Sequence, residues 1–140
     1  MNTPPSADRI EQIAFGFMAS KVLFTAIEFG LFTELAKGPL DANQIQFCLK
    51  LHPRSVHDFL DALVALGMLE RNGQSYSNTS ETDFYLDSAK PTYRGGYFQF
   101  WDAREYPQFG LLGEGLRTGQ PQNVLTLSLS CSLHYFLRQK

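Results

Sequence analysis

The amino-acid sequence predicts a mainly α-helical domain that carries one small β-hairpin. Apolar residues recur at helical spacing over most of the first 66 residues, and helix-capping and helix-ending residues separate these segments. The spacing changes only after Gly67, where short alternating runs flank an Asn-Gly pair. A chain of 140 residues with 44% hydrophobic and 19% charged residues is large and apolar enough for one packed domain.

The first predicted helix is apolar on almost every side. It follows Ser6, a candidate N-cap, and covers residues 10–29. Its apolar residues are Ile10, Ile13, Ala14, Phe17, Met18, Val22, Leu23, Phe24, Ala26, Ile27 and Phe29. A helix that is apolar all round has to be buried all round, and a small domain offers too little protein for that. The pattern therefore predicts burial against a second chain.

Three shorter helices are predicted next. The first covers residues 31–36. Asp41 caps the second, and Gln44 completes a pair typical of a capping box. Pro53 is expected at the first helical position of the third, which ends at Gly67.

The hairpin is predicted to pair residues 68–71 with 74–77 through a type I′ turn at Asn72-Gly73. Short helices followed by a hairpin are the order of a winged helix. Asn78-Thr79 is then expected to cap a helix over 81–86.

Beyond Pro91 the chain is predicted to be helical again, with a last helix over 107–116. Aromatic residues concentrate here, and they suit either core packing or one wall of a pocket for a flat apolar substrate. They are Tyr93, Tyr97, Phe98, Phe100, Trp101, Tyr106 and Phe109. Residues 124–131 alternate as a strand does, without an identified partner strand.

The charge of the chain argues against nucleic acid. A winged helix often reads DNA, so a DNA-binding transcriptional regulator is the alternative function. However, the chain carries 12 basic and 14 acidic residues, a net charge of −2, and residues 53–67 hold Arg54 against Asp58 and Asp61. A groove-reading helix needs several cations for phosphates, so no nucleic-acid partner is expected.

No residues are predicted to be catalytic, cofactor-binding or metal-binding. Cys48 and Cys131 lie too far apart in sequence for a metal motif, and His52 and His57 have no further ligand at zinc spacing. The glycines at 110, 113, 115 and 119 follow no strand, as a dinucleotide loop would.

The sequence also predicts a cytoplasmic protein without a membrane partner. Met1 to Asp8 lacks the basic and apolar regions of a signal peptide. The apolar stretch 22–32 is too short to span a bilayer and carries Glu28.

Several segments resemble O-methyltransferases of the acetylserotonin and plant phenolic type. Residues 26–36 resemble the family pattern A-x-x-L-G-[IL]-F-x-x-L-A, and residues 38–42 resemble G-P-x-T-A. Residues 54–70 resemble R-x-x-x-x-L-D-A-L-x-x-L-G-L-L-E, and residues 76–79 resemble Y-x-N-T. With Tyr85-Leu86, Gly95-Gly96 and Leu116 to Gly119, these segments keep the order of the family.

The resemblance implies an N-terminal winged-helix dimerisation domain over residues 10–90. A flexible segment 1–9 would precede it, and a helical connector 91–120 and an atypical tail 121–140 would follow. The family's S-adenosylmethionine-binding catalytic domain has no counterpart in these motifs, so this chain alone is expected to be inactive and to bind no cofactor. The expected partner is a second copy or a full-length methyltransferase.

The resemblance and the apolar pattern together give two sets of candidate residues. The dimer interface is expected to include Ile13, Phe17, Val22, Phe24 and Ile27. Because partner residues close the substrate pocket in this family, the candidate substrate-facing residues are Phe17, Met18, Phe98 and Trp101.

Overall fold

The computed structural model describes residues 5–120 and divides the chain into two compact units. Unit 1 runs to Gln99 and unit 2 starts at Phe100, nine residues beyond the division expected after residue 90. The tail 121–140, with its strand-like run, lies outside the described residues. Within the segment 1–9 expected to be flexible, residues 8 and 9 already belong to the first helix.

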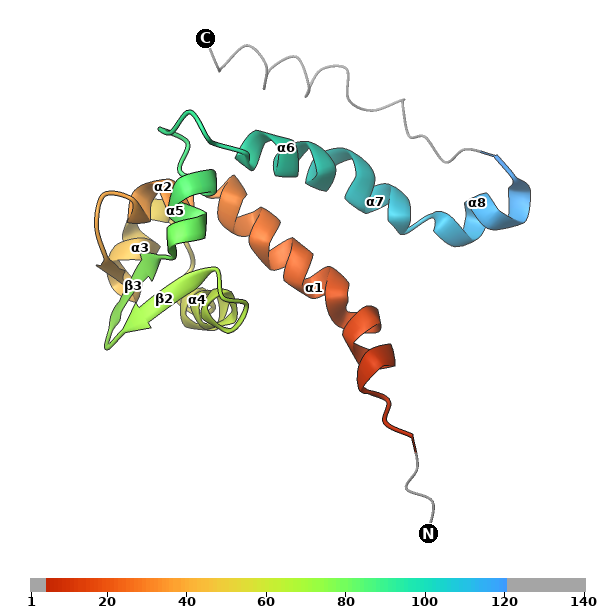
Figure 1. The fold of residues 1–140 in the computed structure, drawn as a ribbon, viewed down its shortest axis with the longest axis horizontal. Helices are drawn as coiled ribbons and strands as arrows, with labels where there is room; N and C mark the ends of the chain where they lie inside the picture. Colours follow the sequence, from red (N-terminus) through yellow and green to blue (C-terminus); the bar gives the residue numbers. More distant parts are fainter. Residues whose placement is uncertain (1–4, 121–140) are drawn as a thin grey trace. The chain divides into compact units, whose positions relative to one another are not determined.

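Unit 1 is mainly helical, as predicted, with one small sheet (Figure 1). Its elements, in chain order, are α1 (Asp8–Glu28), α2 (Leu31–Leu35), β1 (Leu40–Asp41), α3 (Ala42–Leu49), α4 (Val56–Ala65), β2 (Leu69–Asn72), β3 (Ser75–Asn78), α5 (Ser80–Leu86) and α6 (Gly95–Phe100). The last residue of α6 already belongs to unit 2. In this order, helices are followed by a hairpin, and the winged-helix prediction depends on the same order.

The sheet is antiparallel, with strand order β1-β3-β2. Asn72 pairs with Ser75, so the turn consists of Gly73 and Gln74, one residue later than predicted. Of these two residues only Gly73 has a positive φ, of 60°, whereas a type I′ turn needs positive φ at both. The predicted turn type and register are therefore wrong. β1 was not predicted, because two residues carry no periodicity.

Two of the predicted capping residues, Asp41 and Thr79, are confirmed, whereas the N-cap of α1 is Ala7 and not the predicted Ser6. Asp41 Oδ1 accepts a hydrogen bond from the Gln44 N–H, and Gln44 Oε1 accepts one from the Asp41 N–H, both at 2.9 Å. Thr79 caps α5 in the same reciprocal way, with Thr82 as its partner. These bonds satisfy N–H groups that the first turn of a helix otherwise leaves unpaired.

The start predicted for α4 is wrong. The helix begins at Val56, and residues 53–55 form a turn before it. The Arg54 N–H donates to His52 Nδ1 at 3.2 Å, a local side-chain contact that suits a turn rather than a helix. Pro53 therefore stands in this turn and not at the first helical position.

One apolar core holds unit 1 together. Its fully buried large side chains come from α2, α3, α4 and β3: Leu31, Phe32, Ile45, Leu60, Leu63 and Tyr76. Gly30 lets α1 turn sharply into α2, because it adopts a φ of 70° that side chains rarely allow.

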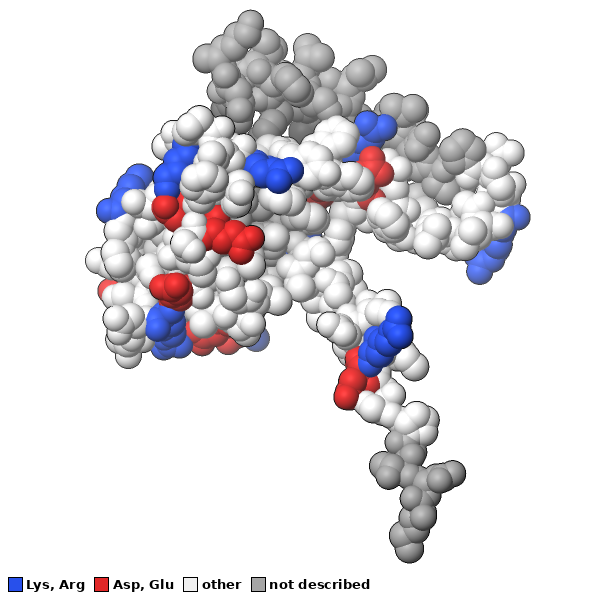
Figure 2. Space-filling view, viewed as in Figure 1, with Lys and Arg blue, Asp and Glu red and all other residues white. Residues whose placement is uncertain are grey.

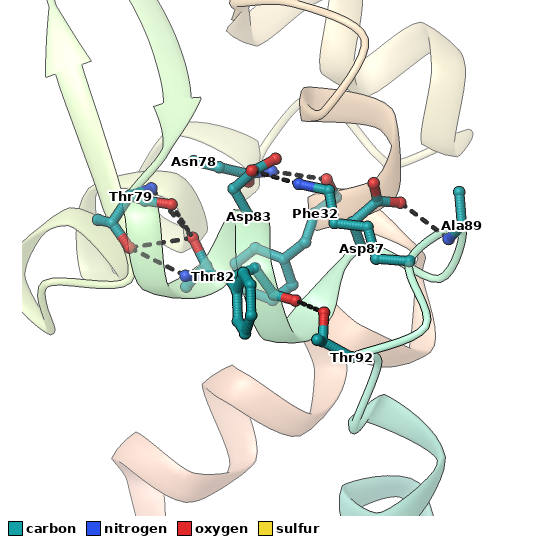
Figure 3. A network of polar contacts seen from close by, with 10 residues as sticks. Phe32, Asn78, Thr79, Thr82, Asp83, Asp87, Ala89 and Thr92 are labelled. Carbon is teal, nitrogen blue, oxygen red and sulfur yellow. Dashed lines mark hydrogen bonds and ion pairs between the residues drawn. The ribbon is translucent and has the colours of Figure 1, made fainter.

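Polar contacts tie the hairpin to α2 and to α5 (Figure 3). Asn78 Nδ2 donates to the Phe32 carbonyl at 2.7 Å, across 46 residues of sequence. Thr82 Oγ1 donates to the Met68 carbonyl at 3.1 Å, and the Asp87 carboxylate accepts from the Ala89 N–H at 3.0 Å. Asn78 belongs to a glycosylation-like Asn-Thr-Ser sequence, and its side-chain amide is used in this packing instead.

The described part of unit 2, residues 100–120, contains three short helical segments: η1 (Trp101–Glu105), α7 (Tyr106–Phe109) and α8 (Leu112–Thr118). η1 is a π-helix, in which the Tyr106 N–H donates to the Trp101 carbonyl five residues earlier. Pro107 has no N–H to donate and follows directly. The single last helix predicted over 107–116 is thus divided, with Gly110 and Leu111 between its two parts.

Candidate dimerisation surface

The second half of α1 packs on the core of its own chain. Ala26 and Ile27 are buried, and Val22 and Leu23 pack against the same core. Ile27 is 4% exposed, so its side chain is already covered within one copy. The core of a single copy therefore accounts for Ile27, and its place in a dimer interface stays a prediction.

The first half of α1, residues 8–18, is exposed along its whole length, and we call it the arm. Ile10 and Ile13 are each 73% exposed, Phe17 is 54% exposed and Met18 is 52% exposed. In Figure 1 the arm is the red end of α1, which extends beyond α2 and α4. In the view of Figure 2, charged atoms mark the beginning of α1 and an uncharged surface follows them. The arm therefore presents a large apolar surface that unit 1 does not cover.

The apolar residues of α1 change sides at about Ala19. At 100° per residue, the core-packing Leu23, Ala26 and Ile27 share one side of the helix. In the arm, Asp8 and Gln12 continue that side and are polar. Of the exposed apolar arm residues, Ile10, Phe17 and Met18 lie on the other side of the helix, whereas Ile13 and Phe15 lie at the two edges of the core-packing side. Much of the apolar surface of the arm thus points away from the side of α1 that packs on its own core.

The remaining interface candidates differ in exposure. Ile13 and Phe17 lie on the arm, whereas Val22 and Phe24 are half-buried in the second half of α1. The sequence reasoning did not include Ile10 in the interface, although it has the helical spacing of Ile13 and Phe17. It also gave no signal for Phe47 on α3, which is 85% exposed.

The substrate-facing candidates come from both units. Phe17 and Met18 lie on the arm, and Trp101 is the first residue of η1 in unit 2. Phe98 is half-buried and packs against the core of unit 1, with its ring centroid 5.6 Å from that of Tyr97. Core packing accounts for Phe98, and a pocket common to the other three stays a prediction.

An open depression beside α8 in unit 2 does not suit S-adenosylmethionine. It has a volume of about 450 Å³ and is lined by Gln108, Leu111, Leu112, Gly115, Leu116, Gly119 and Gln120. This lining offers no ionisable side chain for the charged amino-acid end of the cofactor. The glycines from 110 to 119 lie on or between helices rather than after a strand. Within residues 5–120, no three His, Cys, Asp or Glu side chains are grouped to hold a metal.

A polar cluster fastens the hairpin to α4. Asp61 Oδ1 accepts hydrogen bonds from Arg71 Nη1 at 2.8 Å and from the Tyr76 hydroxyl at 2.9 Å. Burial raises the pKa of Tyr76 above its ordinary value, and the hydrogen bond to Asp61 acts in the same direction. α4 itself carries Asp58 and Asp61 and no Lys or Arg. This helix therefore lacks the cations that contact with DNA phosphates needs.

The length of α1 also bears on the membrane prediction. Its 21 residues are long and apolar enough, by length and composition alone, to cross a bilayer. The sequence prediction considered only the stretch 22–32, which is too short to span a bilayer. The helix itself begins earlier, at Asp8. Length and composition alone are weak evidence, because core helices of soluble proteins also have them. The absence of a membrane partner stays a prediction.

Comparisons with known proteins agree with the exposed apolar arm. Residues 11–88 match the family model of the O-methyltransferase dimerisation domain. The tetracenomycin polyketide synthesis 8-O-methyl transferase TcmO of Streptomyces glaucescens is 45% identical over 114 residues, which are 81% of this chain and 34% of that protein. The N,N-dimethyltransferase OxyT of Streptomyces rimosus is 33% identical over 109 residues, 78% of this chain and 32% of that protein.

A solved structure gives the same result. Human N-acetylserotonin methyltransferase, crystallised in complex with SAM, superposes with a TM-score of 0.76 at 31% identity, over 86% of this chain and 37% of that one. The chain thus spans about a third of the length of the relatives it matches, and the matched part is their N-terminal third. The resemblance found in the sequence motifs is confirmed. Because the family model covers more than half of the chain, this chain belongs to the O-methyltransferase dimerisation domain family.

Proposed function

We propose that the chain serves as the self-associating part of an S-adenosylmethionine-dependent methyltransferase, and that copies pair through the arm of α1. One observation carries the proposal: in a dimerisation domain, the residues with the largest uncovered apolar surface on α1 are Ile10 and Ile13 of the arm. Removal of such surface from water is the main driving force of protein association.

The arm suits either of two partners with the same domain. A second copy gives a homodimer, and a full-length methyltransferase with its own dimerisation domain gives a heterodimer. In either case methyl transfer belongs to a catalytic domain with the S-adenosylmethionine site, as expected from relatives such as the SAM-bound human enzyme. The chain would supply association, not chemistry.

A second role would be to close the substrate pocket of the partner. The candidates for this role are Phe17 and Met18 on the arm and Trp101 in unit 2, and their support is the family resemblance. The relatives transfer methyl groups to oxygen or to nitrogen, as the names of TcmO and OxyT state. We therefore propose no particular acceptor.

Sedimentation equilibrium of the full chain tests the proposal. The wild-type chain should have twice the monomer mass at micromolar concentration, and Ile13→Glu should shift it towards the monomer. Gln12→Glu is the matched control, because it places the same charge on the polar side of the arm. A wild-type chain that stays folded and monomeric at high concentration refutes the proposal, as does a Gln12→Glu variant that dissociates equally.

A further inference from the structure

We infer that the two arms of a dimer cross in antiparallel orientation, with Phe17 of both copies at the two-fold axis. This inference rests on the proposed function, because it requires that the arm pairs with a second copy. It adds the orientation and the register of the pairing, which self-association alone leaves open, and it assigns Phe17 to the arm contact rather than to the substrate pocket.

The spacing of residues along one side of α1 is symmetric about Phe17. Ile10 lies seven residues before Phe17 and Phe24 lies seven residues after it, which is about two helical turns in each direction. Ile13 lies four residues before Phe17, and Lys21 lies four residues after it. In an antiparallel pair with Phe17 on the axis, Ile10 of each copy meets Phe24 of the other, and Ile13 lies along the aliphatic stem of Lys21.

The charges of α1, and the surface that each arm would cover, favour the antiparallel orientation over the parallel one. Parallel arms would place Asp8 and Glu11 of the two copies beside each other and would align the positive ends of both helix dipoles. They would also leave the second halves of the two helices, with the half-buried Phe24, to meet each other. In the antiparallel pair each exposed arm lies along the second half of the other α1.

Single cysteines along α1 test the register in the full chain, with Cys48→Ser and Cys131→Ser as the background. Phe17→Cys should form a disulfide-linked dimer on mild oxidation, because residues on the axis meet their own copies. Ile10→Cys should not, because its two copies would lie about 21 Å apart along the helices, far beyond the roughly 4.4–6.8 Å between Cα atoms that a disulfide allows. Linked dimer is measured on non-reducing gels.

A mixed pair protects the test against loss of the Phe17 side chain. Ile10→Cys and Phe24→Cys chains, unfolded together and refolded, should link to each other in the mixture more than either links alone. Linkage of both Phe17→Cys and Ile10→Cys to themselves indicates parallel arms and overturns the inference. A dimer by sedimentation that links at none of these positions overturns the register and leaves the proposed function intact. A monomeric wild-type chain overturns both.

Discussion

Truncation of Ile13 should weaken self-association strongly without unfolding the chain. Fully burying an isoleucine side chain contributes roughly 1.5–3 kcal/mol. Ile13 is 73% exposed in one copy, so Ile13→Ser removes about 1–2 kcal/mol of burial per copy and about 2–4 kcal/mol per dimer. Because each 1.4 kcal/mol is a factor of ten, the dissociation constant should rise about 30- to 700-fold.

The measurement is a concentration series by sedimentation velocity, with far-UV circular dichroism to show that the helices persist. Phe47→Ser is the matched control, because Phe47 is even more exposed, at 85%, but lies on α3. It should change the dissociation constant less than Ile13→Ser does, although it removes a larger apolar side chain. An equal or larger effect of Phe47→Ser would refute the assignment of the interface to α1.

Four further predictions concern the core, a helix cap, pH and the cofactor. Leu60→Ala removes a side chain with no exposed surface and should lower the free energy of unfolding by about 2–5 kcal/mol in urea titrations. Thr79→Ala removes the cap of α5 and should cost about 1 kcal/mol in the same assay. The folded state holds the Tyr76 proton more tightly than the unfolded state does. The stabilisation that protonated Tyr76 gives the fold is therefore complete below about pH 10 and is lost as the pH rises through the higher folded pKa. The Tyr76→Phe variant should lose less stability over that pH range. Titration calorimetry of the full chain with S-adenosylmethionine should show no binding heat, and saturable binding would contradict this.

Local hydrogen-bonding groups made parts of the fold predictable. Asp41 with Gln44, and Thr79 before α5, act within three residues, so the sequence alone contains both partners of each contact. The hairpin was predicted in kind but missed by one residue. Its register depends on pairing across the sheet with β1, which no local pattern announces.

The uncovered part of α1 was harder to predict than the helix itself. Ile13 and Ile27 are equivalent in the sequence, since both are isoleucines in a helix that is apolar on every side. Only the position of the core distinguishes them: Ile27 faces Leu31, Phe32 and their neighbours, and Ile13 lies beyond them. The same holds for Phe98, whose aromatic ring suits a pocket wall and a core equally well.

The apolar residues of α1 lie on different sides in its two halves, and this explains why a single copy buries only the second half of the helix. Its second half contributes Ala26 and Ile27 to the core, which fixes the direction of the helix relative to α2 and α4. Its first half holds polar residues where a continued core would need apolar ones, so no small extension of unit 1 could cover the arm favourably. Because the arm continues the same helix, the core sets the direction in which the arm offers its apolar residues. A preorganised surface loses less conformational entropy on association than a flexible one, which favours pairing through α1.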